Sequence, residues 1–346
     1  MQKILVIAPS WVGDCMLMQP MLMRLKQRHP GCQIDVLAPS WTAGLLNALP
    51  EVNQAIVNPF PHGALQLKER FRLGVALRAA HYDQAIVLPN SLKSALVPFF
   101  ANIPLRTGFV GELRYGLLND ARKLDKRVLP LMVERFAQLA EPRDGAIPRP
   151  LANPKLTVST GQRDTTLKKL SLVLDQPVAV FCPGAEYGPA KRWPVAYFAE
   201  TAQRLHDSGY AVWLIGSAKD KEVAEKIVAL GNQSARNLCG STDLTDAIAL
   251  LSCAQLVISN DSGLMHLAAA LDRPMIALFG SSSPQFTPPL SAAAQVVRLD
   301  IACSPCFKRE CPLGHFNCMN QLTPDRVWEK LMTVKSDSPL CGSGET

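Results

Sequence analysis

The chain of 346 residues is 48% hydrophobic and 19% charged, which is typical of a globular protein and excludes a disordered one. Its net charge of +7 favours an anionic partner, namely a nucleic acid, a phosphorylated metabolite or an acidic membrane surface. The chain lacks the long Lys/Arg block of a nucleic-acid-binding tail. The apolar run in MQKILVIAPS is too short for a secretion signal and no stretch reaches transmembrane length, so we expect a cytoplasmic protein.

Strands and helices alternate along the first half of the chain. Apolar runs predict buried strands, and apolar residues at helical spacing predict the helices between them. The predicted strands are 3–8, 33–38, 54–57, 84–88 and 105–109. The first predicted helix begins at Gly13, and the others span 41–49, 68–78, 92–101 and 129–139. This alternation predicts a parallel sheet with helices on both faces.

The stretch 146–158 has three prolines and little periodicity, and we interpret it as a linker between domains. The pattern then starts again, with predicted strands at 178–181, 211–215, 256–258 and 275–279 and predicted helices at 166–174, 195–207, 219–230 and 244–253. We therefore predict two doubly wound α/β domains, 1–158 and 159–322, with ligands bound at the carboxyl ends of the strands. Residues 323–346 are expected to form a C-terminal helix and tail that packs back on the N-terminal domain.

Residues 256–274, LVISNDSGLMHLAAALDRP, have the pattern of a strand, a polar turn and a helix. The first backbone N–H groups of a helix lack partners within the helix and can bind an anion. Asp261 and Ser262 can add side-chain hydrogen bonds there, and Gly263 lets a ligand approach the backbone closely. The alternative is an ordinary capped connection, because these residue types are also typical of helix N-termini.

The sequence argues against a dinucleotide oxidoreductase, the obvious competitor among doubly wound proteins. The first strand leads into PSWVGD and the second half opens with PGAEYGPAKRWP, and neither is the Gly-x-Gly-x-x-Gly cradle. The sequence also contains no Walker loop and no Gly-x-Ser-x-Gly elbow.

Five segments carry a resemblance that spans nearly the whole chain. They are WVGD (11–14), LPNSLKSALVPFFANIPLRTGF (88–109), RYGLLND (114–120), PGAEYGPAKRWP (183–194) and NDSGLMH (260–266). In this order they resemble the bacterial ADP-heptose–lipopolysaccharide heptosyltransferases of glycosyltransferase family 9, most closely those that add the second heptose of the inner core. The resemblance implies a GT-B fold, with two Rossmann-like domains facing each other across a crevice. The first domain would bind mainly the acceptor and the second the sugar nucleotide.

The activity that the resemblance implies is inverting transfer of a heptose from ADP-heptose to the first heptose of heptosyl-Kdo2-lipid A. The enzyme would work at the inner face of the inner membrane, as a peripheral protein with no nucleic-acid partner. Alternatives within the fold are addition of the first heptose, another GT-B transfer reaction and epimerisation of a sugar nucleotide. An alternative of another class is a non-catalytic nucleotide- or lipid-binding protein.

Asp14 is the predicted catalytic base. An acid at the start of a helix is often only a cap or a first-turn residue, because it interacts favourably with the helix dipole. The functional interpretation is that Asp14 follows a strand at the crevice and deprotonates the acceptor hydroxyl. The resemblance implies this second role for the aspartate of the WVGD segment.

The donor site is predicted in the second half of the chain. Lys191 would stabilise the leaving pyrophosphate, with Arg192 an alternative on charge alone. The resemblance also implies phosphate contacts from the helix start and His266, although a lone histidine in an apolar helix more often packs in the core. The further donor candidates are Glu186, Tyr187, Asp220 (with Glu222 as its alternative, for the ribose), Thr242 for the adenine, and Asp261, Ser262 and Gly263.

The acceptor is expected to be phosphorylated and carboxylated, which fits basic residues in the N-terminal half. Each lysine or arginine is individually more often a solvated surface residue. The candidates are Lys68, Arg70, Arg72, Lys93, Arg106 and Arg114, of which Lys93 and Arg114 lie in the matched segments.

No cofactor and no catalytic metal are expected, because no Asp-x-Asp pair lies near the donor segments and Lys191 can balance the phosphates. Near the C-terminus, Cys303 and Cys306 have zinc-like spacing, and Cys311 and Cys318 could complete a structural tetrahedral site. The second pair is spaced more widely than in a zinc knuckle, so a bound metal is the less favoured interpretation.

Overall fold

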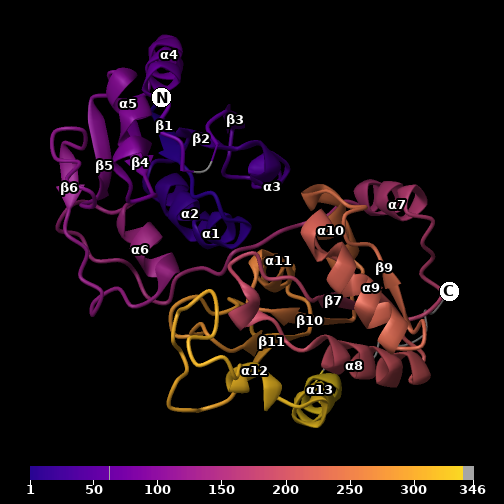
Figure 1. Cartoon of the computed structure of the whole chain (residues 1–346). Coiled ribbons are helices and arrows are strands. Elements are labelled where there is room, and N and C mark those ends of the chain that lie inside the picture. The colour runs from indigo at the N-terminus through magenta and orange to yellow at the C-terminus, as the bar shows by residue number, and fades with distance from the viewer. Residues whose placement is uncertain (62, 338–346) are drawn as a thin grey trace. The chain divides into compact units, whose positions relative to one another are not determined.

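The computed structural model describes residues 1–61 and 63–337 and divides into two units (Figure 1). Unit 1 is Met1–Pro154 and unit 2 begins at Lys155. The division therefore falls inside the proline-containing stretch 146–158. On its far side, the Leu156 amide donates to the carbonyl of Ala270 at 2.8 Å, which ties the start of unit 2 to that unit.

Unit 1 contains a sheet of six parallel strands in the order β3-β2-β1-β4-β5-β6. Both sheet faces are covered, which explains the short, almost continuously apolar runs in its central strands. The strands are β1 (Lys3–Ile7), β2 (Gln33–Pro39), β3 (Gln54–Asn58), β4 (Gln84–Val87), β5 (Leu105–Phe109) and β6 (Asp120–Arg122). The helices are α1 (Val12–Leu17), α2 (Gln19–Arg28), α3 (Ala43–Asn47), α4 (Leu67–Leu77), α5 (Leu96–Phe100) and α6 (Met132–Gln138).

Unit 2 repeats the architecture with the strand order β12-β11-β10-β7-β8-β9. The strands are β7 (Val178–Cys182), β8 (Ala211–Leu214), β9 (Ala235–Asn237), β10 (Leu256–Asn260), β11 (Met275–Phe279) and β12 (Ala294–Arg298). The helices are α7 (Thr160–Lys169), α8 (Val195–Asp207), α9 (Lys221–Leu230), α10 (Leu244–Ser252), α11 (Gly263–Ala270), α12 (Asn317–Asn320) and α13 (Pro324–Asp337). Numbered within each unit, both sheets read 3-2-1-4-5-6, the order of dinucleotide-binding Rossmann domains. The predicted pair of doubly wound domains is confirmed.

Some predicted boundaries are wrong. Helix α7 begins at Thr160 and not at 166, because Ser159 caps it by accepting a hydrogen bond from the Gln162 amide at 3.2 Å. The helix predicted at 129–139 is only Met132–Gln138. Strands β6, β9 and β12 were not predicted, since each is short or half exposed and lies at or near a sheet edge.

The C-terminal helix α13 packs on the sheet of unit 2. It lies against α8, β11 and β12, and its Val327 and Leu331 are fully buried in that unit's core. This differs from the expected packing on the N-terminal domain, and residues 338–346 of the expected tail lie outside the described residues. Among the described helices, none combines the length and apolarity needed to cross a bilayer.

Candidate active site

The chain reverses its direction of winding at one point in each sheet, and ligands of such folds bind outside the carboxyl ends of the strands there. In unit 2 this point lies between β7 and β10, which pair in parallel. The loop after β7 carries Lys191, and the loop after β10 carries Asp261, Ser262 and the first residue of α11. The topology thus brings together the two predicted donor segments, 183–194 and 260–266, which begin 77 residues apart in the sequence.

Lys191 and Asp261 form an ion pair, with 2.5 Å between Nζ and Oδ2. The side chains are only 17% and 5% exposed, so the pair is largely shielded from water. The Asp261 amide also donates to the carbonyl of Leu278 at 3.0 Å, which fixes the aspartate against β11. The Lys191 ammonium is therefore held in place before any ligand arrives.

Asn260 holds these loops together and was not predicted as a site residue. It is fully buried, its Oδ1 accepts from the Trp193 amide at 3.1 Å, and its Nδ2 donates to the Pro183 carbonyl at 2.7 Å. Both partners flank the Lys191 loop. The sequence signal was an amide side chain at the end of an otherwise apolar strand, where a buried polar group needs partners.

The N-terminus of α11 has the features of an anion site. Its N-cap residue, Ser262, is extended and makes no side-chain capping hydrogen bond, while its hydroxyl lies 3.3 Å from that of Ser259. The first N–H groups of the helix are consequently not capped by this side chain. Next along the sheet, Ser281 and Ser282 follow β11, and both have buried hydroxyls with no hydrogen-bond partner among the described residues. Ser281 and Ser282 were not predicted as site residues, and their signal in the sequence was three serines shortly after a buried strand.

His266 lies in α11 and is 7% exposed. Burial lowers its pKa to about 4, with Asp261 acting in the opposite direction and Lys191 lowering the pKa further. The imidazole is therefore neutral at physiological pH. His266 can donate or accept a hydrogen bond beside the ion pair, but it adds no positive charge.

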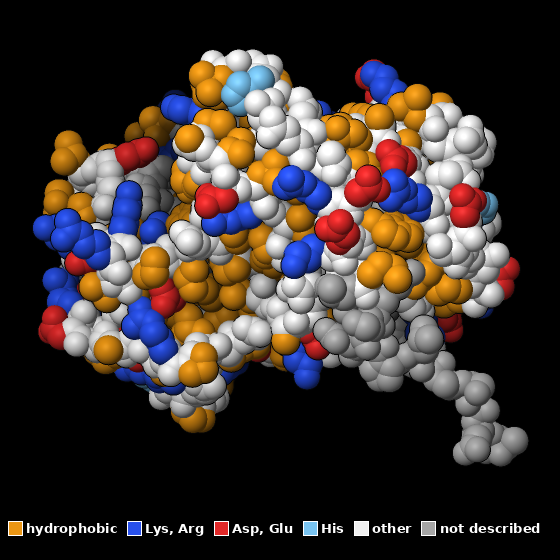
Figure 2. Space-filling view, turned by 90° about the horizontal axis from the view of Figure 1, so that it is seen from below, with side chains coloured by type: hydrophobic (Ala, Val, Ile, Leu, Met, Phe, Trp, Pro, Cys, Tyr) orange, Lys and Arg blue, Asp and Glu red, His pale blue; other side chains and the backbone are white. Residues whose placement is uncertain are grey.

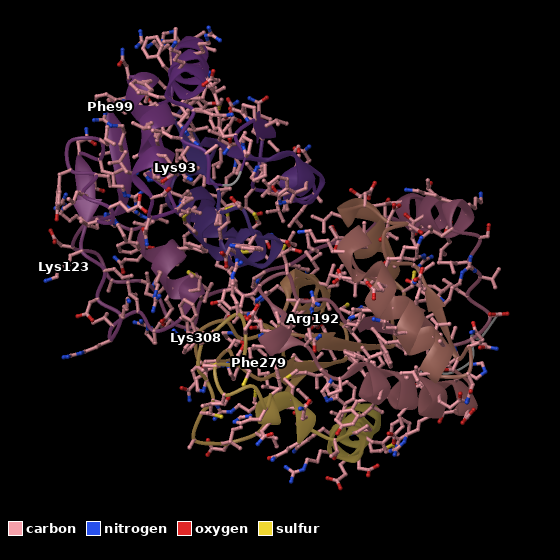
Figure 3. All side chains as sticks on the ribbon, viewed as in Figure 1. Lys93, Phe99, Lys123, Arg192, Phe279 and Lys308 are labelled. Carbon is pink, nitrogen blue, oxygen red and sulfur yellow. The ribbon has the colours of Figure 1, made fainter. Side chains whose placement is uncertain are left out.

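Tyr187 links the Lys191 loop to the segment that follows residue 302. Its ring centroid lies 5.1 Å from the Lys191 ammonium and 5.4 Å from the Arg309 guanidinium. Its hydroxyl donates to the Phe307 carbonyl at 2.8 Å. A β-carbon on Gly188 would lie 2.4 Å from the Arg309 carbonyl oxygen, so only glycine fits where the two segments touch. Figure 3 labels the alternative cation, Arg192, together with Phe279 at the end of β11.

The other donor candidates have partners of their own. Glu186 forms an ion pair with Lys219 and is half exposed. The Asp220 carboxylate accepts from the Ser217 amide at 2.9 Å and its hydroxyl at 2.8 Å, as part of a capping box. Asp220 is nine-tenths buried and its carboxylate fills the space beside Gly184. These contacts give it a structural role in the loop after β8.

The two remaining candidates in this region are placed as follows. Glu222 is exposed on α9 and pairs with Lys226 one turn later. Thr242 is partly buried and stands just before Asp243, which caps α10.

In unit 1 the winding reverses between β1 and β4, and α1 follows β1. Asp14 is the third residue of α1, in its first turn, and it is partly buried. The N-cap itself is Trp11, which makes no side-chain capping bond, so Asp14 is a first-turn acid and not the cap. The aspartate thus stands at the carboxyl end of the central strand, where ligands of this fold bind.

Comparison with known proteins assigns the family. The sequence model of glycosyltransferase family 9 (heptosyltransferase) matches residues 70–317. The chain belongs to glycosyltransferase family 9. It is 51% identical to lipopolysaccharide heptosyltransferase 2 of Salmonella typhimurium, over 97% of this chain and 99% of the relative. It is also 51% identical to the Escherichia coli K12 protein of the same name, over 95% and 97%. Among solved structures it is similar to E. coli ADP-heptose LPS heptosyltransferase II, with a TM-score of 0.88, 47% identity and coverage of 97% and 100%.

The net positive charge of this family 9 glycosyltransferase comes from unit 1. Residues 1–154 contain 18 Lys/Arg and 11 Asp/Glu, whereas residues 155–346 contain 18 of each, so the net charge of +7 belongs to unit 1. Figure 2 shows Lys and Arg side chains gathered along the edge of unit 1, at the left of the view. This asymmetry fits the expected division between a unit for an anionic acceptor and a unit for the donor.

The prediction that Arg114 contacts the acceptor is corrected by its burial. Its side chain is 1% exposed, and all three guanidinium nitrogens donate hydrogen bonds inside unit 1, the shortest at 2.5 Å to the Pro89 carbonyl and 2.6 Å to the Phe109 carbonyl. The Asn90 amide oxygen Oδ1 and the Ser94 hydroxyl oxygen accept as well, at 3.2 and 3.1 Å. Burial lowers the pKa of Arg114 to about 10. Its role is to hold the loop after β4 against β5, and the matched segment alone could not show this.

Other basic candidates divide into internal and exposed residues. Arg70 and Arg106 donate to backbone carbonyls, Arg70 to Leu65 and Ala64, and Arg106 to Leu117 and Ile103. Lys93 is partly exposed in the 3₁₀ turn before α5 (Figure 3), and Lys68 and Arg72 are exposed on α4. Lys93, Lys68 and Arg72 are thus the candidates that remain available for an external anion.

The cysteine-rich segment brings four thiols near one another. Cys303, Cys306, Cys311 and Cys318 are all free and partly buried. Burial raises the pKa of Cys318, and the other three thiols raise it further, so the four share one neighbourhood. Nevertheless, within residues 1–61 and 63–337 no group of three or more His, Cys, Asp or Glu is arranged to hold a metal ion.

Proposed function

We propose that this family 9 glycosyltransferase is a heptosyltransferase II, which transfers a heptose from ADP-heptose to the first heptose of the lipopolysaccharide inner core. Relatives that carry this name are 51% identical over nearly the full length of the chain, which supports the choice of substrates. The observation that carries the donor assignment is the shielded Lys191–Asp261 pair beside the uncapped start of α11.

In the proposed mechanism of transfer, the donor pyrophosphate lies on the N-terminus of α11. Asp14 takes the proton from the acceptor hydroxyl, whose oxygen attacks the anomeric carbon from the face opposite ADP. The new glycosidic bond forms as the bond from the anomeric carbon to the phosphate oxygen breaks, which inverts the configuration. The charge that develops on the leaving phosphate is stabilised by Lys191 and by the first N–H groups of α11. Neutral His266 supplies a hydrogen bond and no charge.

The acceptor is heptosyl-Kdo2-lipid A, and the basic unit 1 binds it. Phosphates and carboxylates of such an acceptor match the excess of Lys and Arg in residues 1–154. We place the enzyme at the cytoplasmic face of the inner membrane, as a peripheral protein, because the lipid part of the acceptor remains in the bilayer. The reaction needs no cofactor and no metal, since the lysine and the helix start balance the phosphate charge.

The decisive experiment compares two acceptors that differ by one sugar. Purified protein is incubated with ADP-heptose and either Kdo2-lipid A or heptosyl-Kdo2-lipid A, and the products are weighed by mass spectrometry. We expect one added heptose on the second acceptor only. Transfer only to the acceptor without heptose would make the chain a heptosyltransferase I. A change in the configuration of ADP-heptose without acceptor, followed by NMR because epimers have the same mass, would point to an epimerase.

A further inference from the structure

Helix α4 leaves an apolar stripe exposed. Leu67, Phe71 and Val75 are spaced four residues apart, so they lie on one face of the helix, and they are 50%, 49% and 39% exposed. The helix is nevertheless firmly attached, because Gly74 faces α5 so closely that a β-carbon there would lie 2.5 Å from Phe100 Cβ. The stripe is therefore a fixed surface feature of unit 1 and not a loosely held segment.

Helix α5 continues this apolar surface. The Phe71 and Phe99 rings both contact Phe100 edge to face, with centroids 5.3 and 5.7 Å away. Phe99 is 39% exposed, and Leu65, just before α4, is 54% exposed. Figure 1 shows α4 and α5 side by side, and Figure 3 labels Phe99. Isolated exposed apolar residues need no explanation, but a continuous group on two packed helices does.

The surroundings of the stripe are basic. Lys68 and Arg72 are exposed one turn apart beside it, and Arg78 follows the helix. In residues 64–106 only Glu69 and Asp83 are acidic, against six Lys and Arg, of which Arg70 and Arg106 are engaged by backbone carbonyls inside the unit. The Asp83 carboxylate already accepts from the Lys3 amide at 2.7 Å. An apolar helix face with aromatic residues, flanked by Lys and Arg, is the pattern of a helix that lies in a membrane interface.

Arg70 makes this surface rigid from beneath. Its guanidinium donates to the carbonyls of Leu65, Ala64 and Lys93, and it stacks 4.0 Å above the Phe60 ring. These contacts join the residues before α4 to those before α5. A preformed surface loses little conformational entropy when it binds.

We propose that the α4–α5 surface, defined by Leu65, Leu67, Lys68, Phe71, Arg72, Val75 and Phe99, docks on an anionic lipid bilayer. The apolar residues enter the interface between headgroups and acyl chains, while Lys68 and Arg72 contact lipid phosphates. A second copy of this chain is a poorer occupant, because a symmetric contact would bring Lys68 and Arg72 toward their own copies. The proposal rests on the proposed function, whose acceptor is a lipid. It assigns Lys68 and Arg72, both candidates for the acceptor sugar, to the membrane instead.

The test measures binding to vesicles of phosphatidylcholine alone or with 30% phosphatidylglycerol by co-sedimentation. We expect the wild type to bind the anionic vesicles, and salt to weaken that binding. Phe71→Ser should weaken it about tenfold, whereas Leu230→Ser, which changes an even more exposed apolar residue of unit 2, should not. Lys68→Glu with Arg72→Glu should abolish it, and the matched pair Lys123→Glu with Lys126→Glu, exposed elsewhere on unit 1, should leave most of it.

Three results would overturn the proposal. They are no binding of the wild type to anionic vesicles, equal binding by wild type and α4 variants, and a wild-type dimer that Phe71→Ser converts to a monomer in light scattering. Circular dichroism checks that each variant is folded. Heptose transfer to an acceptor without acyl chains separates this proposal from the proposed function. The Phe71→Ser variant should keep that transfer. A wild type that binds vesicles but transfers no heptose would contradict the proposed function while it supports the membrane-docking proposal.

Discussion

Lys191 Nζ and Asp261 Oδ2 are 2.5 Å apart, in loops that follow the two central strands of unit 2. Asp261 is almost completely buried, so removal of its cation leaves a charge that neither water nor protein neutralises. The same ammonium is the proposed partner of the donor phosphates. Donor binding and the stability of unit 2 are thereby coupled through one side chain.

Lys191→Ala should lower both ADP affinity and heptose transfer, and it should also reduce the free energy of unfolding by about 3 kcal/mol. Lys191→Met combined with Asp261→Asn removes both charges and should restore most of the stability but not the transfer activity. Isothermal titration with ADP, urea unfolding and the transfer assay follow the three quantities. If the double variant is as unstable as the single one, charge pairing is not the cause.

The buried central strands of two parallel sheets could be predicted from the sequence, because ILVI, VAVFC and LVI are short apolar runs typical of a sheet covered on both faces. The same holds for the meeting of the Lys191 and Asp261 loops, since the carboxyl ends of neighbouring parallel strands lie at one edge. The internal role of Arg114 could not be predicted, because its partners are carbonyls up to 25 residues away and any residue type supplies a carbonyl. Asn260 and the Ser281–Ser282 pair were missed for a related reason: burial, and not residue type, makes their polar atoms important.

His266 should make the protein less stable in mild acid. Its pKa in the folded protein, about 4, lies below the ordinary 6.5, so protons bind more tightly to the unfolded chain. The stabilisation is complete above pH 6.5 and is lost as the pH falls toward 4, by at most roughly 3 kcal/mol. Urea unfolding at pH 7.5, 6, 5 and 4 should show this loss for the wild type and a smaller one for His266→Gln. Parallel curves for the two proteins would mean that other groups cause the acid sensitivity.

Arg114 and Lys93 should separate structure from acceptor binding. Arg114→Ala leaves several buried carbonyls without donors and should reduce the free energy of unfolding by about 3 kcal/mol or more. Lys93→Ala changes a partly exposed side chain, so it should alter stability by less than about 0.5 kcal/mol while it raises the acceptor KM. Thermal unfolding and acceptor titration distinguish the two effects. A stable Arg114→Ala protein with a raised acceptor KM would return Arg114 to the acceptor site.

Transfer should continue after divalent ions are removed. The proposed site balances the leaving phosphates with Lys191 and the N-terminus of α11, so no metal is assigned a step. Activity measured after dialysis against EDTA should equal that of the untreated enzyme, and added magnesium or manganese should not raise it. Loss of activity in EDTA that magnesium restores would contradict this, provided that circular dichroism shows the fold to be unchanged.

Asp14→Asn gives the most direct test of the chemistry. Asparagine has nearly the same size, and Asp14 is not the N-cap of α1, so stability should change by about 1 kcal/mol or less. The variant loses the proton acceptor, and general-base catalysis contributes about 10²–10⁴-fold, so kcat should fall within that range. ADP affinity should stay at the wild-type value, because the proposed donor site lies in unit 2. Glu69→Gln, which changes an exposed first-turn acid of α4, is the matched control and should keep its transfer to an acceptor without acyl chains. An Asp14→Asn protein that unfolds early but keeps near-normal turnover per folded molecule would make Asp14 a structural residue and place the base elsewhere.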